Sequence, residues 1–267
     1  MKVEKIIDVE NLVKKYGKLT AVDDLSFHVN KRDIFAFLGP NGAGKTTTIK
    51  MLTTLLKPTS GSMKVNGLNP TKDQFKVRKS FGIVFQDPSL DNELSAYENM
   101  YFHSLLYGID KKGRKEKIEK LLDFVGLLDR KDSYVKTFSG GMKRRLEIAR
   151  GLIHHPKILF LDEPTIGLDP QTRNHIWNYI KELNKKEGMT VFFTTHNMDE
   201  AERYANHVAI IDYGKILFRG TPDKIKKHAK AKTIEDAFLN LTGHTIRKEA
   251  GGAIDRVRAM AKSWGNR

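Results

Sequence analysis

Residues 39–46 read Gly39-Pro40-Asn41-Gly42-Ala43-Gly44-Lys45-Thr46, which matches G-x-x-x-x-G-K-[ST] at every fixed position. An apolar stretch at 33–38 predicts a strand before this loop, and the apolar spacing at 46–56 predicts a helix after it. Glycines let backbone N–H groups close around phosphate oxygens, and the start of the helix points its positive end at the same anion. We therefore expect a phosphate-binding loop here rather than a chance glycine turn before a helix.

The side chains of this loop and of a second segment have the chemistry that a nucleoside triphosphate needs. Lys45 is expected to reach the β- and γ-phosphates, and the hydroxyl of Thr46 to bind Mg²⁺. Residues 158–163 read as an apolar strand that ends in Asp162 and Glu163. Because strand ends of a parallel sheet line one crevice, Asp162 suits Mg²⁺ through a water, and Glu163 suits a general base. The alternative is an acidic turn before Pro164, which the phosphate loop makes the weaker interpretation.

A second glycine pair follows at Ser139-Gly140-Gly141, where Ser139 is a good N-cap for a helix predicted at 142–153. This segment is a second candidate cradle for an anion. The alternative is a capped helix whose basic residues form a solvated face. These basic residues are Lys143, Arg144, Arg145 and Arg150. Two cradles and one nucleotide suggest a site shared between two copies of the chain.

Strands alternate with helices along most of the sequence, which predicts an α/β fold with a mostly parallel sheet. Antiparallel strands are expected at 6–30, with a break at Tyr16-Gly17, and an inserted helical lobe at about 87–145. Further strands are expected at 62–66, 82–85, 158–161 and 190–195, helices at 171–186 and 198–204, and a hairpin at 208–219. We expect one domain over 1–243 and a basic tail over 244–267.

Composition narrows the class of protein. The chain has 267 residues, a formal charge of +15 and no cysteine, so thiolate chemistry and disulfides are excluded. No apolar run approaches the roughly 18 residues that a membrane span needs, and no signal core is visible, so we expect a cytosolic chain. A basic surface suits nucleic acid, anionic lipid or a nucleotide, and composition does not choose among them.

The ordered set of motifs from 3 to 220 resembles the ATP-binding-cassette (ABC) ATPase family. In this resemblance, 39–46 is similar to the Walker A motif, Ser139-Gly140-Gly141 to the signature, and 159–163 to Walker B. Gln86 is similar to the Q-loop, Gly167-Leu168-Asp169 to the D-loop, and His196 to the switch histidine. Tyr16 occupies the place of the aromatic residue that stacks on adenine. Taken alone, His196 and Tyr16 are as consistent with structural roles at strand ends.

The resemblance implies a P-loop NTPase core, ATP and Mg²⁺ as cofactors, and a head-to-tail homodimer with two ATPs between the subunits. It implies catalytic roles for Glu163, His196, Lys45 and Gln86, and metal contacts for Thr46, Gln86 and Asp162. The nucleotide-binding set that it implies is Tyr16, Gly39, Pro40, Asn41, Gly42, Ala43, Gly44, Lys45, Thr46, Thr47, Ser139, Gly140, Gly141 and Asp169. It also implies a separate transmembrane permease that contacts the helical lobe, and a place on the cytoplasmic face of the membrane.

Departures from the usual signature and D-loop sequences, at Phe138, Met142 and Ile166-Gly167, resemble the drug- and lipid-exporter branch, similar to daunorubicin-resistance-type ATPases. They favour export over import. The alternative is a soluble ABC-type ATPase that acts on nucleic acid or in cofactor assembly, which the charge of +15 supports. The short gap between the two glycine motifs, without sustained heptads, argues against it, and no stable nucleic-acid complex is expected. A catalytically dead cassette is disfavoured because Lys45, Glu163 and His196 are all present.

The tail at 244–267 has six Lys or Arg residues against two acids. Apolar residues at 254–264 share one helical face, which is compatible with a basic helix on anionic lipid. We favour the alternative, a solvated tail.

Overall fold

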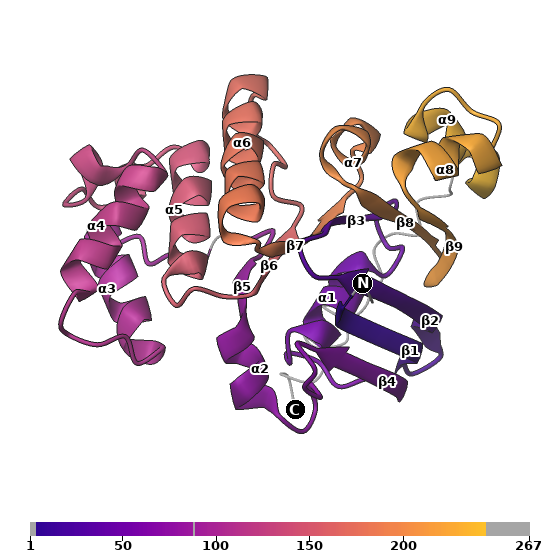
Figure 1. The fold of residues 1–267 in the computed structure, drawn as a ribbon, viewed down its shortest axis with the longest axis horizontal. Coiled ribbons are helices and arrows are strands. Elements are labelled where there is room, and N and C mark those ends of the chain that lie inside the picture. Colours follow the sequence, from indigo (N-terminus) through magenta and orange to yellow (C-terminus); the bar gives the residue numbers. More distant parts are fainter. Residues whose placement is uncertain (1–3, 88, 244–267) are drawn as a thin grey trace, which may run out of the picture.

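The computed structural model describes residues 4–87 and 89–243. A six-stranded sheet forms the centre, with a three-stranded sheet and helices below it and further helices above it (Figure 1). The predictions for 1–3 and for the tail at 244–267, including its lipid contact, lie outside the described residues. Within the described part of the chain, no helix is both long and apolar enough to cross a membrane.

The central sheet has the strand order β5-β6-β7-β3-β8-β9. Its parallel strands are β5 (Phe81–Val84), β6 (Ile158–Asp162), β7 (Thr190–Thr195), β3 (Ile34–Leu38) and β8 (His207–Asp212). The edge strand β9 (Lys215–Gly220) pairs with β8 in antiparallel register. The predicted mostly parallel sheet is confirmed, and all parallel strands end at one edge.

The smaller sheet has the order β2-β1-β4 and is antiparallel throughout. Its strands are β1 (Lys5–Tyr16), β2 (Leu19–Asn30) and β4 (Ser60–Val65). The turn predicted at Tyr16-Gly17 is found, because Tyr16 pairs with Leu19 across it. Buried positions alternate with exposed ones in β4 and the second half of β2, as expected of strands with one face in the core.

Alternation along β3 divides the core between two layers. Phe35 and Phe37 pack with Phe27 of the smaller sheet, with ring centroids 5.9 and 5.4 Å apart, and with α1 (Lys45–Leu52) in the same cluster. Ile34, Ala36 and Leu38 point to the other face and pack under the upper helices. The upper helices are α5 (Gly140–Leu152), α6 (Pro170–Glu187), α7 (Met198–Tyr204), α8 (Pro222–His228) and α9 (Ile234–Thr242).

A third cluster lies at one end of the molecule, among α3 (Ala96–Leu106), α4 (Arg114–Phe124) and α5 (Figure 1). Ser95 begins α3 with a capping box, in which its hydroxyl accepts from the Glu98 N–H and the Glu98 carboxylate accepts from the Ser95 N–H. Two 3-10 turns, η1 (Leu128–Arg130) and η2 (Val135–Thr137), connect α4 to α5. The helix α5 therefore belongs both to this lobe and to the cover of the central sheet.

Several local predictions were wrong. The helix predicted over 46–56 ends at Leu52, because Thr54 adopts a φ of +67°, which no helix continues through. Three short helices were not predicted. The first, α2 (Gln74–Ser80), follows Asp73, while Thr221 and Thr233 cap α8 and α9 by accepting from backbone N–H groups. Helix α8 is only two turns long, and its lysine-rich sequence was interpreted as part of a charged segment without a helix.

Candidate active site

The glycine loop connects the buried strand β3 to α1, and its glycines are required for space as well as for conformation. A methyl group at Gly39 would overlap the carbonyl oxygen of Ile211 in the neighbouring strand β8. Gly44, which precedes α1, has a φ of +102°, and a methyl group there would lie 2.5 Å from the carbonyl oxygen of Ala21. The loop is therefore held between the β8–β9 hairpin and β2.

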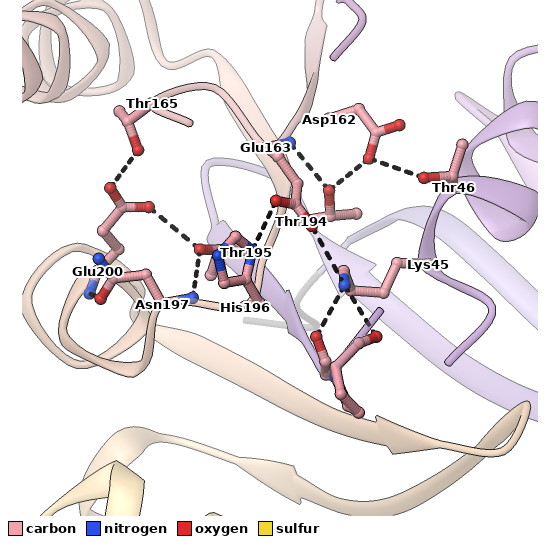
Figure 2. A network of polar contacts seen from close by, with 12 residues as sticks. Lys45, Thr46, Asp162, Glu163, Thr165, Thr194, Thr195, His196, Asn197 and Glu200 are labelled. Carbon is pink, nitrogen blue, oxygen red and sulfur yellow. Dashed lines mark hydrogen bonds and ion pairs between the residues drawn. The ribbon is translucent and has the colours of Figure 1, made fainter. Parts of the chain in front are cut away.

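Lys45 lies under this loop rather than pointing to solvent, and it is only 5% exposed. Its ammonium group donates to the carbonyl oxygens of Gly39, at 2.7 Å, and Pro40, at 3.1 Å. The Glu163 carboxylate forms an ion pair with it at 3.2 Å (Figure 2). The contact of Lys45 with phosphate stays a prediction, and in the structure its ammonium group is paired with Glu163.

Asp162 ends β6 and faces the phosphate loop. Its Oδ1 lies 3.3 Å from Oγ1 of Thr46, and Oγ1 of Thr194 donates to the same oxygen at 2.6 Å. The Asp162 carboxylate is almost fully buried. The hydroxyl of Thr194, on the neighbouring strand β7, holds it in place. A hydroxyl and a carboxylate oxygen at this spacing form a pair of oxygen donors of the kind that Mg²⁺ accepts.

Glu163 has a φ of +50°, a strained value for a residue with a Cβ. Its N–H is held by the hydroxyl of Thr194 at 3.0 Å and by the Thr194 carbonyl oxygen at 3.2 Å. The turn sends the side chain to Lys45 and to His196, whose Nδ1 lies 2.6 Å from Oε2 of Glu163 (Figure 2). His196 is about half exposed while Glu163 is buried, so the pair joins the core to the surface.

A second acid, Glu200 in the first turn of α7, fixes the segment that carries His196. Oε2 of Glu200 accepts from the hydroxyl of Thr195 at 3.2 Å, and the other carboxylate oxygen accepts from the hydroxyl of Thr165. The hydroxyl of Thr195 in turn accepts from the N–H of Asn197 at 2.9 Å (Figure 2). The ends of β6 and β7 are thus joined through one buried carboxylate.

The second glycine motif lies apart from the phosphate loop, at the start of α5, whereas α1 lies on the other side of the central sheet (Figure 1). Ser139 caps α5 by accepting from the N–H of Met142 at 3.3 Å. A methyl group on Gly141 would lie 2.7 Å from Cγ2 of Thr172 in the first turn of α6. Asp169 caps α6 by accepting from the Thr172 N–H at 2.9 Å. Hydrogen bonding from the side chain of Thr172, and then from its backbone, holds the pKa of Asp169 below its usual value. The structure thus brings Ser139-Gly140-Gly141 and Asp169 to one place.

Tyr16 and Gln86 are less tightly placed. Tyr16 is 44% exposed at the end of β1, with the Lys14 ammonium 5.2 Å from its ring centroid. It belongs to the hairpin whose Ala21 touches Gly44. Gln86 is exposed, and among the described residues it makes no hydrogen bond with Asp162 or Glu163. The predicted stacking of Tyr16 on adenine and the predicted metal contact of Gln86 therefore stay predictions.

Comparison with known proteins agrees with this geometry. The family model described as "ABC transporter" matches residues 22–166, more than half of the chain. The chain belongs to the ABC transporter family. The linearmycin resistance ATP-binding protein LnrL of Bacillus subtilis (strain 168) is 42% identical over 229 residues, which cover 86% of this ABC chain and 73% of LnrL. The daunorubicin/doxorubicin resistance ATP-binding protein DrrA of Streptomyces peucetius is 41% identical over 222 residues, covering 83% and 67%.

Solved structures agree with the fold. The ATP-binding subunit of an ABC transporter superposes with a TM-score of 0.81 at 28% identity and covers 89% of this ABC chain and 100% of its own. The ATP-binding cassette MJ0796, solved as a dimer in a post-hydrolysis state with ADP and Pi, superposes with a TM-score of 0.74 at 25% identity. It covers 80% of this chain and 98% of its own. The protein is therefore an ABC ATPase with the expected α/β fold.

Sequence reasoning missed Thr194, Glu200 and Arg144 of this ABC ATPase. Thr194 and Thr195 are consecutive hydroxyl residues at the end of an apolar strand, and this pattern could have indicated that they face the site. For Arg144 the alternative of a solvated basic face is wrong, because its side chain is 8% exposed. The spacing of Arg144, Ile148 and Gly151 along α5 places the arginine on the face toward the sheet, where Ile148 and Gly151 are also buried.

Proposed function

We propose that this chain is the ATP-hydrolysing subunit of an exporter and works with a separate transmembrane permease. The observation that carries the proposal is the cluster at the ends of β6 and β7, where Lys45, Glu163 and His196 form one continuous chain of contacts beside the phosphate loop. The names of LnrL and DrrA, both resistance proteins, support export by analogy. The departures at Phe138, Met142 and Ile166-Gly167 point the same way.

In this proposal the loop N–H groups and Lys45 bind the phosphates, Tyr16 stacks on adenine, and Thr46, Asp162 and Gln86 hold Mg²⁺. Bound Mg²⁺ would neutralise charge on the phosphates and orient them. Glu163 accepts a proton from the attacking water. His196 orients the Glu163 carboxylate through the 2.6 Å contact and approaches the γ-phosphate from the exposed side. A phosphate that takes Lys45 as its partner leaves Glu163 free to act as the base.

We further propose that ATP is shared between two copies of the chain. Ser139, Gly140 and Asp169 are exposed, and Gly141 is partly exposed, at the starts of two helices, where N–H groups and the helix dipole favour an anion. The helices α5 and α6, which begin at these residues, lie on the upper side of the sheet, whereas α1 lies below it (Figure 1). A head-to-tail homodimer would bring these residues to the phosphate loop of the partner, and the dimeric state of MJ0796 supports this arrangement.

The permease is proposed to contact the helical lobe, which we place at about 87–145 within a single domain over 1–243. Exposed apolar side chains gather in the second half of α3, where Phe102 is 50%, Leu105 44% and Leu106 80% exposed. Apolar side chains grouped in this way on one helix mark a contact with another protein. This contact would hold the chain on the cytoplasmic face of the membrane.

Membrane fractionation of cells that express the chain with its native permease tests the transporter assignment. Leu106→Asp should release the chain from the membrane fraction without changing the ATPase activity of the purified protein. The matched control is Leu239→Asp on α9, whose side chain is 40% exposed outside the lobe. If Leu106→Asp remains on the membrane, the docking face is wrong. If the chain instead binds nucleic acid in a strongly salt-sensitive way, the alternative of a nucleic-acid ATPase replaces the proposal.

A further inference from the structure

Arg144 is a buried cation whose hydrogen bonds converge on two loops of the active site. Its guanidinium group forms five hydrogen bonds. Nη2 donates to the carbonyl oxygens of Asp162 and Glu163, both at 3.0 Å, and Nε donates to that of Pro164 at 2.7 Å. Nη1 donates to the carbonyl oxygen of Phe85 and to the carboxylate of Glu147 at 3.2 Å.

The close packing of α5 on β5 lets a side chain on the lobe reach this position. A methyl group on Gly82 of β5 would overlap the carbonyl oxygen of Gly151 on α5. Gly82 and Gly151 therefore bring the helix and strand backbones together, and Arg144, two turns before Gly151, extends across the ends of β5 and β6. The guanidinium fork matches several carbonyl oxygens at once, which the single ammonium group of a lysine cannot do.

Glu147 balances the buried charge and extends the network to the segment after β5. The carboxylate is 1% exposed, and Oε1 accepts from the N–H of Ser89 at 2.8 Å. Arg150 donates to the carbonyl oxygen of Ser89 at 2.8 Å and also contacts its hydroxyl. Phe85 and Ser89, which flank Gln86 and Asp87, are thus both bound by side chains of α5. Burial lowers the pKa of Arg144, and the nearby Glu147 opposes that shift.

Two of the four carbonyl groups that Arg144 binds belong to the acids of the site, Asp162 and Glu163. The Glu163 peptide needs support because its φ of +50° is strained, and such a conformation persists only where the surroundings fix it. Thr194 holds the N–H of Glu163, and Arg144 holds its carbonyl oxygen. The direction of the carboxylate toward Lys45 therefore depends on a residue of the helical lobe.

We propose that Arg144 is a positioning residue: through its carbonyl contacts, the placement of α5 sets the geometry of both Asp162 and Glu163 and of the segment that carries Gln86. The inference rests on the roles proposed above for Asp162 and Glu163. Movement of the lobe is then transmitted to the catalytic carboxylate directly, through one guanidinium group. Arg144 and the Ser139-Gly140-Gly141 motif belong to the same helix, α5, so a displacement of the motif would also displace Arg144.

The test compares Arg144→Lys with Arg145→Lys, the same change at the next position of the helix. Arg145 binds the carbonyl oxygens of Val125, at 2.7 Å, and Gly126, at 3.3 Å, which belong to the lobe alone. We expect Arg144→Lys to lower kcat by at least about tenfold, as loss of supporting contacts does around a catalytic group, with KM for ATP nearly unchanged. Arg145→Lys should keep kcat. Hydrogen exchange at 162–166 should become faster in Arg144→Lys only.

The proposal is overturned if the two variants have equal kcat, or if exchange at 162–166 is the same in both. If Arg144→Lys does not fold, Glu147→Gln is used as the test instead. This change keeps the shape of the Glu147 side chain and removes the negative charge that is paired with Arg144. A Glu147→Gln variant with the wild-type kcat and exchange would overturn the proposal, and a loss of both would support it. Glu163→Gln is measured alongside, since an active Glu163→Gln would show that the assigned base, and not the role of Arg144, is wrong.

Discussion

Replacing Glu163 with glutamine keeps the size of the side chain and removes its charge, so it separates catalysis from nucleotide binding. A positioned general base contributes a factor of about 10² to 10⁴ to the rate. We therefore expect kcat to fall by that factor, which corresponds to about 3–5 kcal/mol of activation free energy. Phosphate release under saturating Mg-ATP measures this loss.

The same variant should bind ATP at least as tightly as the wild-type protein. The ammonium of Lys45 and the carboxylate of Glu163 are 3.2 Å apart and both buried. Two unit charges at this distance attract each other by about 5 kcal/mol at an effective dielectric constant of 20. Most of that attraction offsets desolvation, and Lys45 keeps its bonds to Gly39 and Pro40, so the net effect is small. A fluorescent ATP analogue should show a Kd that is unchanged or lower by up to about tenfold.

The control for both measurements is Glu182→Gln, which changes an exposed acid on α6 paired with Lys186. It should change neither kcat nor the Kd for ATP. Hydrolysis by Glu163→Gln at a rate close to that of the control would refute the assignment of the base. A clearly higher Kd would refute the inference that Glu163 and phosphate compete for Lys45.

Two further predictions follow from the site and from the lobe. Lys45→Ala should weaken ATP binding by more than about tenfold, measured by the same analogue, because a buried ammonium aimed at phosphate is lost; unchanged affinity would mean that the loop is misassigned. Burial lowers the pKa of His103 and of His154 to about 4 from 6.5, so both are neutral in the folded chain and become charged on unfolding at mildly acidic pH. The unfolded state binds more protons between pH 6.5 and 4, so stability should fall as the pH is lowered through this window. Urea denaturation should show a weaker pH dependence in His103→Gln, and an identical dependence would contradict the burial argument.

The features that sequence predicted best are local in the chain. The phosphate loop, the acidic end of β6 and the cap of α5 are each specified by a few consecutive residues, and the structure places them at the predicted element ends. The parallel sheet was also predictable, since apolar strands alternate with helices. The helical lobe could be anticipated from its periodicity, and the structure resolves it into α3 and α4.

The features that sequence missed depend on contacts between distant segments. Thr194 meets Asp162 only because β7 pairs with β6, and Arg144 meets Phe85 only because α5 lies on β5. The sequence does not show which distant group the hydroxyl of Thr194 or the guanidinium group of Arg144 will bind. The roles of Tyr16 and Gln86 stay predictions, since neither side chain contacts the carboxylates of the site in the described part of the chain.

If ATP is bound between two copies of this chain, the mass of Glu163→Gln in solution should depend on the nucleotide. Light scattering should be recorded with Mg-ATP, with Mg-ADP and without nucleotide, at several salt concentrations. We expect twice the chain mass of 30.4 kDa with Mg-ATP only. A protein that is saturated with ATP and still has the mass of a single chain would contradict it.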